Sequence, residues 1–150
     1  MMITYLDASA LVKRYVAEAG SDDVNALIGE ATALGTAVIS RAEVAAALAK
    51  AARVKLVTRD AAAAALTAFN GDWEDMIRLQ LTEALAARAA GLAWEYGLRG
   101  YDAVHLATAL FWRETLDESV TVATYDRELW KGAKTSGLAV WPSAFSSTVT

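Results

Sequence analysis

The 150-residue sequence contains no cysteine, one proline and one histidine. Without cysteine the chain cannot form a disulfide framework or a thiolate metal site, and this composition fits a reducing cytosol. Charged residues interrupt the Ala-rich stretches well before the roughly 18 consecutive apolar residues that a membrane span needs. The N-terminus lacks the basic segment and long apolar run of a signal peptide. We therefore expect a cytoplasmic protein that makes no contact with a membrane.

Basic residues are too few for a protein that holds nucleic acid by charge alone. The chain has 14 Lys and Arg against 18 Asp and Glu, a net charge of −4, whereas electrostatic binders of nucleic acid are usually basic. The balance changes if acidic residues are clustered on a metal ion, because with four of them neutralised the remaining charges cancel. A metal-neutralised site could therefore still approach a phosphate backbone.

Short apolar runs alternate with helical patterns along the chain, which is 55% hydrophobic and 21% charged. Strands are predicted over residues 3–6, 36–39, 76–81, 120–124 and 138–141, and helices over 8–18, 21–33, 40–53, 58–69, 82–97, 102–116 and 126–134. This alternation predicts an α/β fold, with about five parallel strands and helices on both faces of the sheet. We expect one domain over residues 1–150, with a loose polar tail over 143–150.

Local motifs predict some of the boundaries. Ser40 and Glu43 are spaced as a capping box at the start of a helix. The Asn70-Gly71-Asp72 segment is expected to break the helix that begins at Thr58. Pro142 is expected to end the last strand.

The segment from Leu98 to Ala109 places one carboxylate, Asp102, at the start of an otherwise apolar helix. A carboxylate in that position needs a capping bond, a cation or a metal ion. Asp7 and Asp126 directly follow strands, and Glu43 lies one turn into the helix after the second strand. Ligands of open α/β sheets bind outside the carboxyl ends of the strands. We therefore expect these four carboxylates to share one edge of the sheet.

Four converging carboxylates would repel one another and raise one another's pKa values unless a cation compensates them. Oxygen ligands select hard ions such as Mg²⁺ or Mn²⁺. Such an ion lowers the pKa of bound water and stabilises charge on a phosphoryl oxygen, so the chemistry indicated is phosphodiester hydrolysis. Simple helix capping is the alternative for Asp7, Glu43 and Asp126 taken one at a time.

Three further polar residues adjoin the expected site. Ser9 and Thr124 could bond a carboxylate or cap a helix. His105 lies three residues after Asp102 on the same helical face. It could act as a ligand or general base, but we favour a packed imidazole bonded to a backbone or carboxylate oxygen.

Four segments resemble the PIN-domain family, in particular the VapC-type toxin ribonucleases of type II toxin–antitoxin systems. They are residues 5–16, Ser40-x-x-Glu43, residues 101–109 and residues 124–129, in the family's order and spanning nearly the whole chain. The resemblance implies a doubly wound sheet and a Mg²⁺- or Mn²⁺-dependent endoribonuclease acting on structured RNA. It also implies a homodimer and a small VapB-like antitoxin whose tail enters the acidic groove.

Carried over by position, the resemblance gives the catalytic and metal-binding set as Asp7, Glu43, Asp102 and Asp126, with Thr124 as a hydroxyl neighbour. Two alternatives remain. A receiver-like signalling domain would need adjacent acids at the first strand and a lysine after a late strand, and the sequence offers neither. A degenerate PIN-type module would bind RNA or a partner without cutting, and the intact acidic set argues against it.

Overall fold

Five parallel strands form one sheet in the order β3-β2-β1-β4-β5. The computed structural model describes residues 2–145. The strands are β1 (Ile3–Leu6), β2 (Ala33–Ala37), β3 (Ile77–Leu79), β4 (Val120–Ala123) and β5 (Ala139–Trp141). The helices are α1 (Ala8–Tyr15), α2 (Ser21–Glu30), α3 (Ser40–Arg53), α4 (Arg59–Trp73), α5 (Glu83–Tyr96), α6 (Gly100–Leu116) and α7 (Arg127–Thr135). The predicted α/β class and five-stranded parallel sheet are confirmed.

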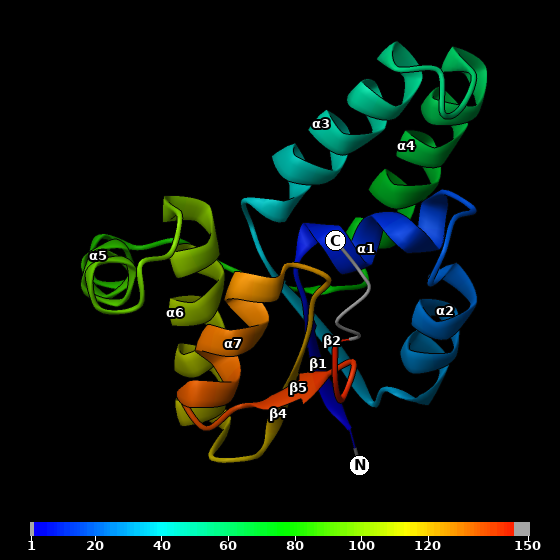
Figure 1. The fold of residues 1–150 in the computed structure, drawn as a ribbon. Coiled ribbons are helices and arrows are strands. Elements are labelled where there is room, and N and C mark those ends of the chain that lie inside the picture. The colour runs from blue at the N-terminus through cyan, green and yellow to red at the C-terminus, as the bar shows by residue number, and fades with distance from the viewer. Residues whose placement is uncertain (1, 146–150) are drawn as a thin grey trace.

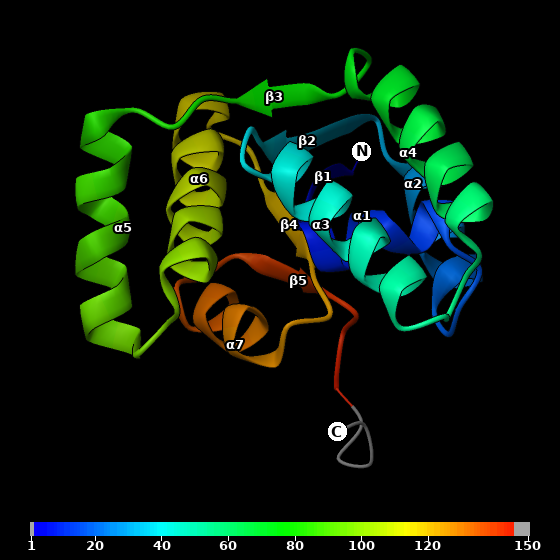
Figure 2. The same cartoon turned by 90° about the horizontal axis from the view of Figure 1, so that it is seen from above.

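Helices cover both faces of the sheet because successive side chains of a strand point to opposite faces. Ile3 and Tyr5 of β1 belong to the apolar cluster shared with α5, α6 and α7. Leu6, the next residue, belongs to the second cluster, which is shared with α1, α2, α3 and α4. Seen from above, the two groups of helices lie on opposite sides of the strands (Figure 2).

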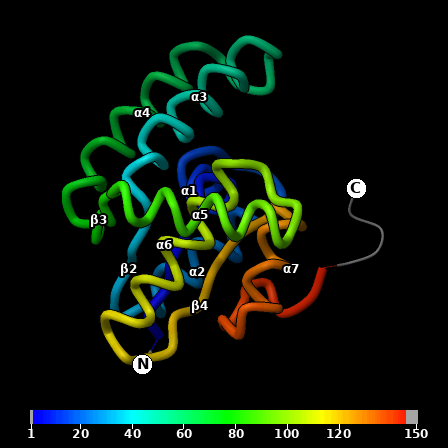
Figure 3. The backbone as a smooth tube through the Cα atoms, turned by 90° about the vertical axis from the view of Figure 1, so that its left-hand side faces the viewer, coloured from blue at the N-terminus to red at the C-terminus, as the bar shows by residue number. Residues whose placement is uncertain are grey.

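Helix α6 is apolar nearly all round because it lies between α5 and the sheet. Figure 3 shows α5 in front of α6 on the outer side of the molecule. Buried positions recur along α6, from Asp102 and Ala103 to Leu110 and Trp112. A helix buried on both sides needs this composition, which explains the apolar sequence that follows Asp102.

Glycine at position 35 of β2 allows α6 to lie close to the sheet. A Cβ atom at Gly35 would lie 2.6 Å from the Trp112 ring atoms Cη2 and Cζ3, well inside contact distance. Trp112 is buried, with 4% of its surface exposed. The large aromatic ring therefore fills the space that a missing side chain leaves on β2.

Several predicted boundaries are wrong. Helices α1 and α2 end at Tyr15 and Glu30, three residues before the predicted ends at 18 and 33. The Asn70-Gly71-Asp72 segment does not break a helix, because α4 continues to Trp73. Phe69 and Trp73, one turn apart, are both buried and their ring centroids lie 5.5 Å apart, so burial overrides the local breaking signal. Strand β2 starts at Ala33 instead of residue 36, since Ala33 already pairs with Ile3 of β1.

The predicted capping box is also wrong. Helix α3 has Ile39 as its N-cap, with no capping bond from a side chain, so Ser40 is its first residue. The Ser40 hydroxyl is buried and lies 2.7 Å from the Thr36 hydroxyl of β2. Glu43 is consequently free of a capping role and available to the site.

Other helix ends follow their sequence signals. The side chains of Asp7, Thr58, Thr82 and Asp126 each accept a bond from a first-turn backbone N–H. Helices α3 and α4 pair and project beyond the carboxyl edge of the sheet (Figure 1). Residues 146–150 of the predicted loose tail lie outside the described residues. Within residues 2–145, no helix combines the length and apolar character needed to cross a membrane.

Candidate active site

The chain reverses its direction of winding between β1 and β4. From β1 it crosses to β2 and β3 on one side, and it then returns to place β4 and β5 on the other. The carboxyl ends of two strands at such a switch point bound a crevice, which is where ligands of open α/β sheets bind. Asp7 follows β1 directly, and Thr124 and Asp126 follow β4. The sequence predicts that Asp7 and Asp126 lie at the same edge of the sheet. The parallel pairing of β1 with β4, which this prediction requires, is confirmed.

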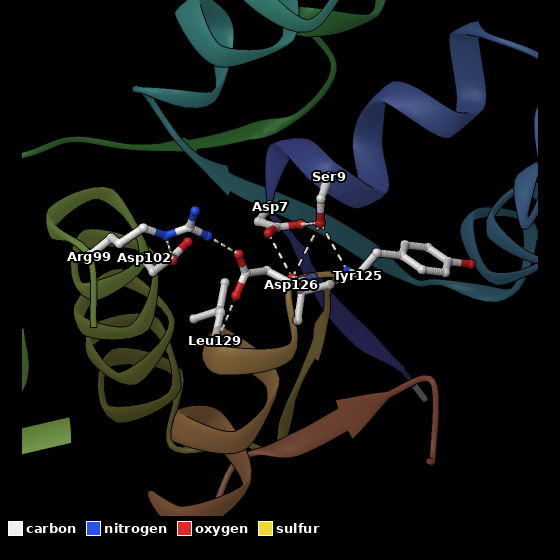
Figure 4. Close-up of polar contacts among 8 residues, drawn as sticks. Asp7, Ser9, Arg99, Asp102, Tyr125, Asp126 and Leu129 are labelled. Carbon is white, nitrogen blue, oxygen red and sulfur yellow. Dashed lines mark hydrogen bonds and ion pairs between the residues drawn. The ribbon is translucent and has the colours of Figure 1, made fainter. Parts of the chain in front are cut away.

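The register of β1 and β4 brings the Asp7 carboxylate against hydroxyl groups. Leu6 pairs with Ala123, so Asp7 and Thr124 come next to each other as the strands end. Thr124 Oγ1 donates to Asp7 Oδ2 (2.7 Å), and Ser9 Oγ donates to Asp7 Oδ1 (2.7 Å). The Tyr125 N–H in turn donates to Ser9 Oγ (2.9 Å) (Figure 4). The two hydroxyl side chains therefore fix the orientation of the buried carboxylate.

Capping and a site role coexist in Asp7 and Asp126. Asp7 Oδ1 accepts from the Ala10 N–H (3.1 Å), and Asp126 Oδ1 accepts from the Leu129 N–H (3.0 Å). Each carboxylate thus caps its helix with one oxygen, at a helix N-terminus that favours negative charge. The second oxygen has another partner in each case. Oδ2 of Asp7 accepts from the Thr124 hydroxyl, and Oδ2 of Asp126 pairs with Arg99.

Arg99 joins two of the predicted site residues. Its Nε donates to Asp102 Oδ2 (3.1 Å), and its Nη2 forms an ion pair with Asp126 Oδ2. Figure 4 shows the guanidinium group between the two carboxylates. The Asp102 side chain is 3% exposed, whereas that of Arg99 is 60% exposed. A cation at the mouth of the crevice therefore partly balances acids within it.

Burial raises the pKa values of the two most buried acids, and repulsion from other carboxylates adds to the rise at Asp102. Burial raises the pKa of Asp7, although His105, the hydroxyl bonds and the Ala10 N–H oppose the rise. Burial, followed by the charge of Asp126, raises the pKa of Asp102 to about 6, and Arg99 only partly offsets this. Charged carboxylates are thus disfavoured here, which is the condition that a bound cation would relieve.

Glu43 is linked to α6 through the only histidine. His105 Nε2 lies 2.7 Å from Glu43 Oε1, and His105 Nδ1 lies 2.6 Å from the Tyr5 hydroxyl. His105 is 1% exposed and Tyr5 is fully buried. The geometry agrees with a packed imidazole bonded to a carboxylate, the reading that the sequence favoured. Ser9 and Glu43 also line one open groove, together with Tyr101.

Two contributors to the site had little or no signal in the sequence. Arg99 lies three residues before Asp102, and only that spacing could have indicated an ion pair. Lys13, Arg14 and Arg41 instead contact Glu18, Asp72 and the Trp73 ring, respectively. Tyr5 had no signal, because its hydroxyl acquires a role only when α6 packs on β1.

The chemistry of the donor set fits a hard divalent cation. All four predicted ligands are carboxylates, and the hydrogen-bond donors to Asp7 are neutral groups. Among residues 2–145, no three acidic or histidine side chains lie close enough together to hold an ion in the present side-chain conformations. Arg99 supplies the positive charge at Asp102 and Asp126 instead.

Solved structures share this fold. PAE2754 from Pyrobaculum aerophilum matches with a TM-score of 0.65 at 24% identity, covering 93% of this chain and 89% of that one. A toxin–antitoxin complex from Klebsiella pneumoniae matches with a TM-score of 0.59 at 18% identity, covering 82% and 86%.

Sequence comparison gives nearer relatives. Ribonuclease VapC45 of Mycobacterium tuberculosis (strain CDC 1551 / Oshkosh) is 38% identical over 147 residues, which covers 95% of this chain and 97% of the relative. Ribonuclease VapC49 of Mycobacterium tuberculosis (strain ATCC 25618 / H37Rv) matches to the same extent. The family model described as PIN domain matches residues 4–134. The chain therefore belongs to the PIN-domain family, as its four sequence segments indicated.

Proposed function

We propose that this protein is a metal-dependent endoribonuclease and acts as a VapC-like toxin. The observation that carries the proposal is the placement of three buried or half-buried acids at the switch point: Asp7 and Asp126 follow the paired strands β1 and β4, and Arg99 bridges Asp126 to Asp102. Burial raises the pKa values of Asp7 and Asp102 there. The similarity to two proteins named Ribonuclease VapC supports RNA as the substrate.

Asp7, Glu43, Asp102 and Asp126 would hold Mg²⁺ or Mn²⁺. When bound, the ion supplies an activated water and stabilises charge on the phosphoryl oxygens. The chain's own residues provide the preorganised frame. Ser9 and Thr124 orient the Asp7 carboxylate through bonds of 2.7 Å, and His105 orients Glu43. The buried positions of Asp7 and Asp102 limit access of bulk water to the site.

Asp7→Asn and Asp102→Asn should each lower RNA cleavage at least a hundredfold, because an amide is a weak ligand for a hard cation. Cleavage is measured on total RNA and a defined stem-loop with Mg²⁺ or Mn²⁺, followed by mapping of the new ends. Both variants keep the shape of the side chain.

Asp117→Asn is the matched control. It makes the same change at the other end of α6, at an exposed position whose left-handed backbone (φ 52°) also suits asparagine. It should cleave like the wild type. Activity that survives both site substitutions, or that persists in excess EDTA, would contradict the proposal.

The proposed partners are a structured RNA, a small VapB-like antitoxin and a second copy of the chain, in the cytoplasm. The similarity of fold to a toxin–antitoxin complex supports the antitoxin. Several large apolar side chains are exposed, including Trp94 (92%) and Phe111 (47%). Exposed apolar surface is typical of proteins that bind a partner.

Of the two alternative functions, strand order argues against one, and an experiment can test the other. A receiver-like domain has the strand order 2-1-3-4-5, which differs from the order observed here, so that alternative is set aside. A PIN-type module without nuclease activity is distinguished by metal titration. Such a module would show no saturable binding of Mg²⁺ or Mn²⁺, whereas the proposed nuclease would.

A further inference from the structure

Arg99 is a cationic residue that contacts two of the proposed metal ligands. It is the residue before α6, and its guanidinium contacts Oδ2 of Asp102 through Nε and Oδ2 of Asp126 through Nη2. The two acids come from different elements, α6 and the start of α7. A single side chain thus bridges two carboxylates that are 24 positions apart in sequence but close together in the crevice (Figure 4).

The Arg99 side chain is much more exposed to solvent than the two acids that it contacts. The side chains of Asp102 and Asp126 are 3% and 18% exposed, and that of Arg99 is 60% exposed. The acids are therefore held within the crevice while the arginine reaches in from solvent. Returning the guanidinium to water incurs no desolvation cost, whereas Asp126 caps α7 and Asp102 lies buried in the first turn of α6.

A second contact holds the guanidinium beside the two carboxylates. Arg99 Cζ lies 4.9 Å from the centroid of the Tyr101 ring, which is 46% exposed. A cation–π contact of this kind stabilises an exposed guanidinium. The contact does not depend on the two carboxylates, so Arg99 can release them and keep it.

We propose that Arg99 is an internal counter-ion that exchanges with the divalent cation. It pairs with Asp102 and Asp126 when no metal is bound, and it leaves these carboxylates when the metal enters. Two positive groups cannot both lie at bonding distance from the same oxygen without strong repulsion. The inference rests on the proposed metal site, and it adds that the chain itself competes with the metal.

The exchange predicts that removal of the arginine strengthens metal binding. Mn²⁺ affinity is measured by calorimetry and by the loss of the free-ion electron paramagnetic resonance signal, on full-length protein without RNA. Arg99→Gln should bind Mn²⁺ roughly 5- to 20-fold more tightly than the wild type, as expected for removal of two competing ion pairs that are partly exposed. Arg99→Lys keeps the charge but not the two-pronged geometry, so its affinity should lie between the two.

Arg88→Gln is the matched control. Arg88 forms a two-bond ion pair with Glu114 (2.7 and 2.8 Å) that is exposed and separate from the site residues. This change removes the same charge and should leave Mn²⁺ affinity unchanged. Circular dichroism and thermal unfolding establish that each variant is folded.

The possible results separate the two proposals. Unchanged or weaker Mn²⁺ binding by folded Arg99→Gln, with saturable binding by the wild type, overturns the counter-ion role and leaves the nuclease proposal intact. Equal tightening in Arg88→Gln overturns it as well, because net charge would then be the cause. Absence of saturable Mn²⁺ binding in both the wild type and Arg99→Gln overturns the metal site together with the exchange.

Discussion

At the scale of single residues, two acids of the site, Asp7 and Asp126, have a local structural role as well as their proposed chemical one. Each caps a helix with Oδ1, while Oδ2 contacts Thr124 in Asp7 and Arg99 in Asp126. The capping interpretation and the site interpretation were competing readings of the sequence, yet the same side chain satisfies both. A spacing argument therefore cannot separate them, because the backbone requirement and the site requirement coincide at the carboxyl end of a strand.

The raised pKa of Asp102 predicts how stability depends on pH in the absence of metal. The pKa rises from 3.8 to about 6 in the folded chain, so the folded state binds the proton more tightly than the unfolded state. The stabilisation that comes from protonation is lost as the pH rises through about 6. Asp102→Asn cannot ionise. Its free energy of unfolding at pH 7.5 should therefore be about 1–3 kcal/mol higher than that of the wild type.

Urea unfolding in EDTA between pH 4 and pH 8 checks this prediction. The advantage of Asp102→Asn should shrink as the pH falls from 7 toward 4. Asp117→Asn, on the same helix, should follow the wild type across the range. A stability difference that stays constant with pH would show that ionisation of Asp102 is not its cause.

At the scale of secondary-structure elements, the approach of α6 to β2 depends on Gly35. A methyl group there would meet the Trp112 ring at 2.6 Å. Gly35→Ala should therefore lower the free energy of unfolding by about 1–3 kcal/mol through overpacking. Thermal or urea unfolding measures the loss.

A double variant tests the cause. Trp112→Phe leaves space beside β2, so Gly35→Ala should cost less in the Trp112→Phe background than alone. Gly29→Ala, on an open face of α2 with no atom within 4 Å of the added Cβ, should be neutral or stabilising. Equal losses from Gly35→Ala in both backgrounds would exclude the ring as the cause.

The elements with periodic patterns or clear caps could be predicted from sequence, and those decided by tertiary contacts could not. The starts of α4, α5 and α7 follow their cap residues Thr58, Thr82 and Asp126. The length of α4 depends on the burial of Trp73, and the start of α3 depends on where the Ser40 hydroxyl is buried. Both boundaries depend on burial, which the packing of the whole domain decides.

The same division holds for the candidate site. The positions of Asp7 and Asp126 followed from the strand ends, because a parallel sheet brings such ends together. The bridge through Arg99 and the link from Tyr5 to His105 could not be predicted. Both depend on side-chain conformations set by the packing of α6.

At the scale of the whole molecule, a bound cation should stabilise the fold. Mg²⁺ or Mn²⁺ at 100 times its dissociation constant adds about 2.7 kcal/mol if it binds only the folded chain. For a domain of this size that corresponds to a rise of roughly 5–10 °C in Tm. Differential scanning fluorimetry with and without the ion measures the shift.

Asp117→Asn should keep the full rise in Tm, and Asp102→Asn should lose most of it. Since this readout needs no RNA, it separates loss of metal from loss of substrate contact. An equal rise in Asp102→Asn would place the ion elsewhere on the molecule.

The pairing of β1 with β4 has a consequence for the synthesis of the protein. Asp7 is synthesised before Thr124 and Asp126, which follow it by 117 and 119 positions. A nascent chain that still lacks β4 has no partner for β1 at this edge and lacks the bond from Thr124 to Asp7. Because so distant a contact forms late in folding, the crevice is completed only after β4 and Asp126 have been synthesised. The proposed nuclease site is therefore incomplete while the first 119 residues of this sequence are being made.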